Sequence, residues 1–168
     1  IPLVKGAIAE KIIHQNPKDK DDYKEINTLT IGAPVGEKAS AVMMAKDKIL
    51  FIGGQQKGKG FAASNEAIII DISDSFNPKI EKRESMHYPR ANADATILPT
   101  GDIFVNGGTA IYQGAYDDTY FSNFTPEIYK TNDDIWKKMS KTNFRRNYHS
   151  TSLLLPDGRV FVAGGDAW

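Results

Sequence analysis

Tyr148 and His149 are the residues best placed to do chemistry, and they stand together in the stretch RNYHSTSLLLPDGRVFVAGG. A phenol and an imidazole can both bind a metal ion, although both also serve as packing and hydrogen-bonding groups. Neighbouring residues on a regular β-strand point to opposite faces of a sheet. The two side chains can therefore reach one metal ion only at a strand end, where the backbone turns. The polar residues before the apolar run predict such a strand end here.

The elements that must position this pair are β-hairpins punctuated by glycine doublets. The doublets Gly53-Gly54, Gly107-Gly108 and Gly164-Gly165 close the apolar segments KILFIGG, DIFVNGG and RVFVAGG. A tight turn and another apolar segment precede each of them. Glycine in the turns PTGD and PDGR indicates hairpins, because glycine adopts positive φ without steric cost. The segments AIIIDIS and EIYKTNDDIW predict further strands after the first two doublets.

The repeated unit predicts the fold class. The doublets recur roughly every 55 residues, a period typical of propeller blades that contain several strands. We therefore expect an all-β fold of four-stranded antiparallel blades, about three of them, with the last one truncated after its second strand. Strand-end glycines suit the crowded backbones near a propeller axis. An ordinary β-meander sandwich is the alternative.

The chain is expected to divide at about residue 30. In this interpretation residues 1–30 form a charged, irregular N-terminal arm, and residues 31–168 form a partial propeller. Propellers close with about four to eight blades, so the remaining blades should come from another chain or from missing sequence. The chain begins IPLVKG, without a methionine or a signal-peptide pattern, and we expect a processed product or a fragment.

Composition excludes several classes of function. Lys and Arg total 21, as do Asp and Glu, so the zero net charge supports neither a nucleic-acid partner nor an anionic-membrane patch. The apolar stretches, such as AIII and SLLL, are far shorter than the roughly 20 residues of a membrane-spanning helix. The sequence has no cysteine, which excludes a disulfide framework and a thiolate metal site within it.

Three motifs carry a resemblance to a known family. Gly107-Gly108 is followed by Tyr129 and Trp136 in the Gly-Gly…Tyr-x6-Trp pattern of a kelch blade. The segments FTPEIY (124–129) and YHSTSLLLPDGRVF (148–161) resemble the catalytic propeller of galactose oxidase and the glyoxal oxidases, which are copper radical oxidases. The resemblance extends from about Ala33 to the C-terminus and is densest in the last 45 or so residues.

The resemblance implies a copper site and an oxidase reaction. By position, Tyr148 corresponds to a catalytic tyrosine that ligates copper, and His149 to a histidine ligand. Phenolate and imidazole suit Cu(II), which favours oxygen and nitrogen donors. The implied reaction oxidises a primary alcohol or an aldehyde with O2 and yields H2O2, and the implied location is secreted or in the cell envelope. The family's other tyrosine, its cross-linked cysteine and its second histidine have no counterpart here, so this chain alone is expected to be inactive.

The substrate positions depart from the family pattern. Galactose oxidase has an arginine before a related stretch, and the segment TLTIGAPVG has none. It also has Tyr-Gln after the first doublet, where this chain reads QQKGKGFA. Galactose is therefore not expected to be the substrate. Tyr112, Tyr116 and Tyr120 lie in an aromatic-rich loop and are predicted to line a rim that binds a small alcohol, aldehyde or carbohydrate, since aromatic rings offer stacking surfaces. They could equally cover a blade edge.

A second function remains open. The same fold could be a non-catalytic kelch propeller that binds a protein or a carbohydrate, because a fold does not determine its function. Two other features have structural interpretations: His87 is expected to be a structural histidine, and Asp133-Asp134 is expected to form a turn between outer strands.

Overall fold

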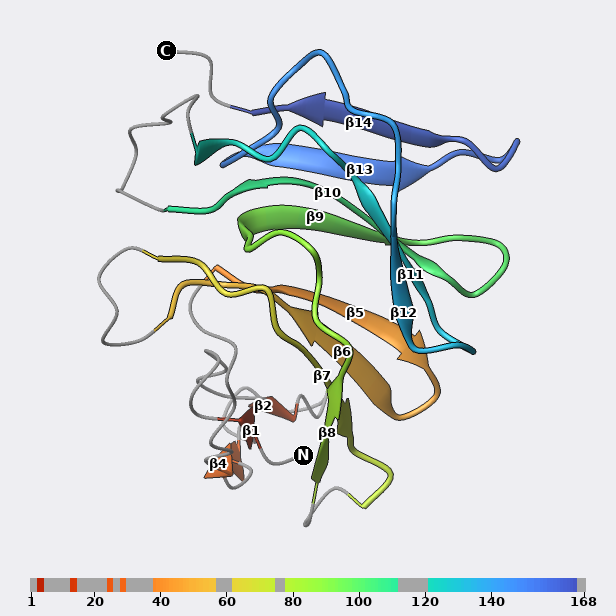
Figure 1. Cartoon of the computed structure of the whole chain (residues 1–168). Coiled ribbons are helices and arrows are strands. Elements are labelled where there is room, and N and C mark those ends of the chain that lie inside the picture. The colour runs from red at the N-terminus through yellow and green to blue at the C-terminus, as the bar shows by residue number, and fades with distance from the viewer. Residues whose placement is uncertain are drawn as a thin grey trace.

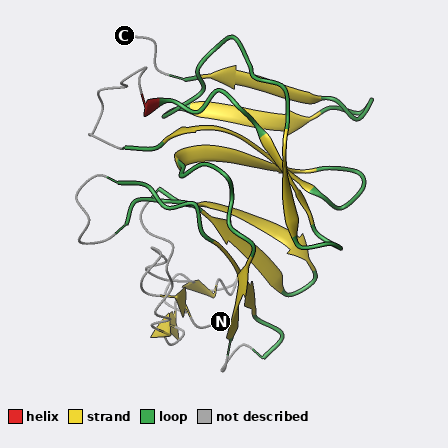
Figure 2. Ribbon diagram, in the orientation of Figure 1, coloured by secondary structure: helices red, strands yellow, loops and turns green. Residues whose placement is uncertain are grey.

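The computed structural model describes residues 38–56, 62–74, 78–111 and 121–165, together with four two-residue strands nearer the N-terminus. Strands joined by turns and loops dominate these residues (Figure 2). In chain order the strands are β1 (Leu3–Val4), β2 (Ile13–His14), β3 (Lys24–Glu25), β4 (Thr28–Leu29), β5 (Ser40–Ala45), β6 (Lys48–Ile52), β7 (Ala67–Asp71), β8 (Lys79–Arg83), β9 (Ala91–Ile97), β10 (Ile103–Thr109), β11 (Glu127–Lys130), β12 (Ile135–Lys138), β13 (Ser150–Leu154) and β14 (Val160–Gly164).

The main strands form three consecutive antiparallel sheets. The first has the order β5-β6-β7-β8, the second has the order β9-β10-β11-β12, and the third pairs β13 with β14. The sheets follow one another across the molecule, with β5, β9 and β13 as neighbouring first strands (Figure 1). The predicted all-β class of four-stranded antiparallel blades is confirmed, and the third sheet has two strands among the described residues.

Local turn chemistry explains the hairpins. Gly101, with a φ of 82°, lies in the turn between β9 and β10, and Gly158, with a φ of 85°, lies in the turn between β13 and β14. In the latter turn the Asp157 carboxylate accepts hydrogen bonds from the backbone N–H and the guanidinium of Arg159. The predicted turn at Asp133-Asp134 also lies between two strands, β11 and β12.

The core lies between the first two sheets. Leu50, Ile52 and Ile69 from the first sheet share one buried cluster with residues of the second sheet, which are Ile103, Val105, Tyr129 and Trp136. Tyr129 and Trp136 are cross-strand partners with ring centroids 4.9 Å apart. The Tyr129 hydroxyl donates to Asp134 and the Trp136 indole donates to the Glu84 carbonyl, so both polar groups are satisfied. The seven-residue spacing of Tyr129 and Trp136 thus places the two rings opposite each other on neighbouring strands.

The glycine doublets lie where one sheet meets the next. The Gly54 N–H donates to the Arg90 carbonyl at 2.7 Å, and the Gly108 N–H donates to the Arg146 carbonyl at the same distance. A Cβ at Gly107 would lie 1.8 Å from the Arg146 carbonyl oxygen, and the φ of Gly107 is +68°. This close approach of two backbones requires glycine. Because the same contact recurs between successive sheets, the repeat seen in the sequence corresponds to a repeat in the structure.

The N-terminal part adds little to the described structure. β1 pairs with β4 in parallel, and β2 pairs with β3 in antiparallel orientation. Because most of residues 1–37 lies outside the described residues, the predicted division at residue 30 stays a prediction. Within the part of the chain that the structure describes, no helix has the length and apolar character needed to cross a membrane.

Candidate functional site

The Tyr148-His149 pair lies in a turn that ends where β13 begins, at Ser150. His149 has a φ of 62°, in the left-handed region that side chains with a Cβ rarely adopt. The two rings are therefore not directed to opposite faces, as they would be on a strand. Their centroids are 3.7 Å apart and their planes differ by 31°, so the phenol ring and the imidazole ring are stacked at a tilt. The pair thus lies at a strand end, as the sequence predicts.

Backbone hydrogen bonds hold this turn. The Ser150 N–H donates to the Asn147 carbonyl at 3.1 Å, and the Gly165 N–H donates to the His149 carbonyl at 3.2 Å. A Cβ at Gly164 would lie 2.5 Å from the His149 carbonyl oxygen. The third glycine doublet thus leaves the space that this turn occupies.

The same backbone conformation recurs in all three sheets. Lys38, Asn92 and His149 have φ values of 63°, 56° and 62°, and each lies within two residues of the start of the first strand of its sheet. The Asn92 N–H donates to the Lys38 carbonyl at 3.0 Å and so links the first two of these positions. The scaffold therefore presents three equivalent positions, and only the third carries a histidine.

These three positions surround one pocket of about 370 Å³. Its wall consists of the beginnings of β5, β9 and β13 and includes Asp94, Tyr148 and His149. Tyr148 is half-buried and His149 is exposed. Among the residues that the structure describes, no group of three or more His, Cys, Asp or Glu side chains could hold a metal ion. Any metal bound here would need further ligands.

Asp94 joins the pocket wall to the turn. The Ser150 hydroxyl lies 2.5 Å from the Asp94 Oδ2 atom and donates to it, and it lies 2.7 Å from the Asn147 carbonyl oxygen. Burial raises the pKa of the Asp94 carboxyl above its usual value, and the hydrogen bond from Ser150 opposes that rise. Sequence reasoning missed Asp94, because no local pattern links it to a residue 56 positions away.

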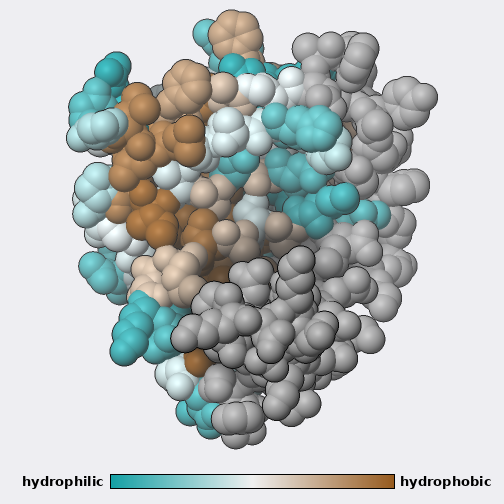
Figure 3. All heavy atoms as spheres, turned by 180° about the vertical axis from the view of Figure 1, so that it is seen from behind, coloured by the Kyte–Doolittle hydropathy of each residue, from teal (hydrophilic) through white to brown (hydrophobic). Residues whose placement is uncertain are grey.

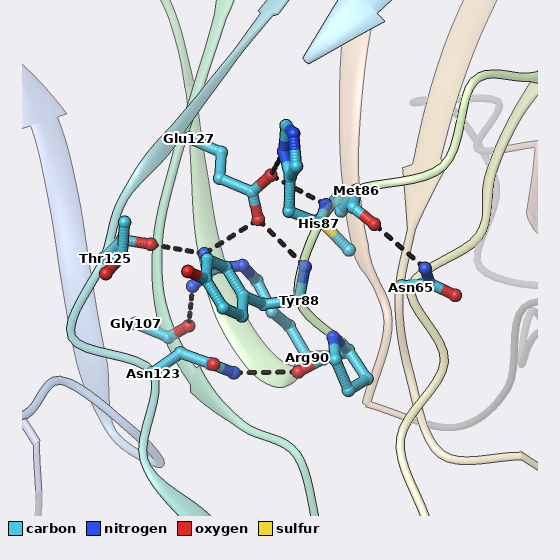
Figure 4. A network of polar contacts seen from close by, with 10 residues as sticks. Asn65, Met86, His87, Tyr88, Arg90, Gly107, Asn123, Thr125 and Glu127 are labelled. Carbon is cyan, nitrogen blue, oxygen red and sulfur yellow. Dashed lines mark hydrogen bonds and ion pairs between the residues drawn. The ribbon is translucent and has the colours of Figure 1, made fainter. Parts of the chain in front are cut away.

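A second polar cluster, of which sequence reasoning named only His87, supports the scaffold (Figure 4). The side chains of Arg90 and Glu127 are fully buried and form an ion pair at 3.0 Å. Arg90 also donates to the carbonyls of Gly107 and Thr125. Burial lowers the pKa of the Arg90 guanidinium, and the charge of Glu127 opposes that effect. The cluster ties the connection before β9 to β10 and β11.

His87 belongs to this second cluster. Its Nδ1 atom lies 2.7 Å from the Glu127 Oε2 atom, and its backbone N–H donates to the same oxygen at 2.8 Å. The structure thus places His87 on a buried carboxylate of the scaffold, in agreement with the structural role expected for it. The three predicted rim residues, Tyr112, Tyr116 and Tyr120, lie outside the described residues.

Comparisons with known proteins identify the family. Residues 44–167 match the family model described as the glyoxal oxidase N-terminus. A galactose oxidase from Gibberella zeae is 35% identical over 137 residues, which are 79% of this chain and 20% of that protein. An aldehyde oxidase from Vitis pseudoreticulata is 37% identical over 87 residues, which are 49% of this chain and 16% of that protein.

A solved structure gives the same result. A fungal alcohol oxidase in complex with copper, described as having catalytic diversity within the AA5 family, superimposes with a TM-score of 0.68 at 28% identity. The match covers 76% of this chain and 27% of that one. The antiparallel sheets agree with this likeness, and the family model covers most of the chain. The chain belongs to the glyoxal oxidase N-terminal family, and it spans about a fifth of the length of its galactose oxidase relative.

Proposed function

We propose that this chain is part of a copper radical oxidase that oxidises a primary alcohol or an aldehyde with O2 and yields H2O2. Tyr148 and His149 act as copper ligands in this proposal, and Tyr148 also takes part in catalysis. The observation that carries it is the stacked arrangement of a phenol and an imidazole at the wall of a pocket, in a chain of this family. The copper in the related fungal alcohol oxidase structure supports the choice of metal.

The donor set fits copper. Imidazole nitrogen and phenolate oxygen suit Cu(II), which stands highest in the affinity order of the divalent first-row metals. Tyr148 and His149 present their rings together because the turn at His149 brings them to one side of the chain. Bound copper would supply the one-electron chemistry that amino-acid side chains lack. The remaining ligands would come from outside the described residues.

The rest of the proposal concerns the complete protein. Further blade-like sheets, from another chain or from adjoining sequence, would cover the open faces of this segment. Tyr112, Tyr116 and Tyr120 would line the rim through which a small alcohol, aldehyde or carbohydrate enters. We further propose that the complete protein is secreted or resides in the cell envelope.

The test uses the complete gene product that contains this chain. Tyr148→Phe and His149→Ala should each lower the copper content measured by mass spectrometry and abolish peroxide release on primary alcohols and aldehydes. Tyr88→Phe is the matched control. It removes a phenol hydroxyl from another tyrosine, and the hydrogen bond of Tyr88 to Glu127 is kept because the backbone N–H makes it. If both site variants keep the copper and the activity of the unchanged protein, the assignment fails.

A second candidate is a kelch-type module that binds a protein or a carbohydrate without catalysis. It is motivated by the unmatched substrate positions and by the absence of cysteine from these 168 residues. The same experiment separates the two functions, because a binding module would show neither copper nor peroxide release before any substitution is made.

A further inference from the structure

Two side-chain contacts join the first strands of the second and third sheets. The Ser150 hydroxyl lies 2.5 Å from the Asp94 carboxylate, and the Thr96 and Ser152 hydroxyls lie 2.5 Å apart. Both contacts run from β9 to β13, two residues apart on each strand. The two contacts have the same length and connect the same strands. They differ in their distance along β13 from the Tyr148-His149 turn.

The contact at Asp94 acts directly on that turn. Ser150 follows His149, and its backbone N–H and its hydroxyl both lie within hydrogen-bonding distance of the Asn147 carbonyl. Asp94 is therefore bound to the residue that closes the turn. A carboxylate is a stronger acceptor for a hydroxyl than a neutral oxygen is. This hydrogen bond links Ser150 to β9.

The turn needs such support. A left-handed φ at a residue with a Cβ is unfavourable, and it persists only where the surrounding structure holds it. The backbone hydrogen bond from Gly165 supports the His149 carbonyl, and Asp94 supports the next residue, Ser150. The His149 carbonyl and the residue after it are thus held by contacts from the end of the third sheet and from the second sheet.

We propose that Asp94 is a positioning residue, which acts through Ser150 to set the orientation of the Tyr148 and His149 rings toward the pocket. The part of the inference that concerns copper rests on the proposed function, and the part that concerns ring orientation does not. Residues that orient metal ligands by hydrogen bonds typically change metal affinity about 10–100-fold when they are replaced. Asp94 would act in this way through Ser150, the residue next to His149.

The first test needs no metal. In the copper-free complete protein labelled with 13C-histidine, the His149 ring protons are shielded by the adjacent Tyr148 ring, and their signals are assigned by their loss in His149→Gln. Asp94→Ala and Ser150→Ala should shift these signals toward unstacked values. Ser152→Ala is the matched control, since it removes the parallel contact on the same strands, and it should leave the signals in place.

The second test measures copper affinity. Asp94→Ala and Ser150→Ala should weaken Cu(II) binding about 10–100-fold, whereas Ser152→Ala should not. Asp94→Asn keeps an acceptor oxygen and should restore most of the affinity and the ring signals. Melting temperatures of the variants show whether a loss of binding merely reflects unfolding.

The outcomes are distinct. Unchanged ring signals in folded Asp94→Ala, or equal effects of Ser150→Ala and Ser152→Ala, would overturn the positioning role. If the complete protein binds no copper, the proposed function fails, and the ring signals alone still decide the role of Asp94.

Discussion

At the scale of the residue, the buried carboxylate of Glu127 and the half-buried carboxylate of Asp94 have different environments. Glu127 faces Arg90, and both of its oxygens accept hydrogen bonds from the segment 87–90. Asp94 has only the Ser150 hydroxyl as a partner among the described residues, and burial raises its pKa. The first carboxylate stabilises the scaffold, and the second is held in the wall of the pocket at some cost to stability.

Asp94→Asn should therefore raise the stability of the protein at neutral pH. Because the folded state raises the pKa of Asp94 above 3.8, this group's contribution to stability falls as the pH rises through the range just above that value. The neutral amide keeps an acceptor for Ser150 and avoids the charge. Thermal melting of both proteins from pH 3 to pH 8 should show a difference that is largest at neutral pH and vanishes in acid. A variant less stable than the unchanged protein at pH 7 would contradict this expectation.

Glu127→Ala should strongly destabilise the protein, because it leaves the Arg90 charge buried without its partner. Breaking a buried pair from one side costs about 3–5 kcal/mol. Chemical denaturation measures this loss. Glu81→Ala is the control, because its ion pair with Arg83 lies nearer the surface, where such pairs contribute about 0–1 kcal/mol. Equal losses in the two variants would show that the Arg90-Glu127 pair has no special role.

At the scale of the element, local chemistry decides what the sequence can reveal. The hairpins β9–β10 and β13–β14 were predictable because glycine turns and apolar runs lie next to each other in the chain. β8 was not predictable, because its sequence KIEKR is mostly charged. It is a strand because it pairs with β7. The Tyr148-His149 turn was predictable from its position before an apolar run, whereas Asp94 reaches it only through the packing of two sheets.

The glycine doublets give a prediction at this scale. Gly107→Ala should destabilise the protein by about 3 kcal/mol or more, since it combines a positive φ with a Cβ 1.8 Å from the Arg146 carbonyl oxygen. Gly158→Ala also has a positive φ but meets no atom within 4 Å, and it should cost only about 1 kcal/mol. Denaturation midpoints of the two variants test this, and similar midpoints would mean that sheet contact does not require glycine.

At the scale of the whole molecule, the described sheets leave apolar surface uncovered. Leu153 and Phe161 are cross-strand partners on the last sheet and are 57% and 50% exposed, which is unusual for large apolar side chains in direct contact. Hydrophobic residues also gather on the face of the molecule seen from behind (Figure 3). The exposed Leu153-Phe161 pair is what a following sheet would cover in the proposed propeller.

Phe161→Asp should therefore lower the melting temperature of the complete protein by several degrees, because a charge would be buried under the next sheet. Ile135→Asp is the control, since Ile135 is exposed on the outermost strand of the second sheet. If both substitutions are tolerated equally, nothing covers the last sheet in the complete protein.

The shared backbone of Lys38, Asn92 and His149 has a consequence for how such a protein can diversify. Each sheet contributes to the pocket one residue with the same left-handed φ. The side chain at such a position can be exchanged without changing the strands that carry it. New reactivity at this pocket would then require only point substitutions, while the glycines and turn residues that determine the fold stay unaltered.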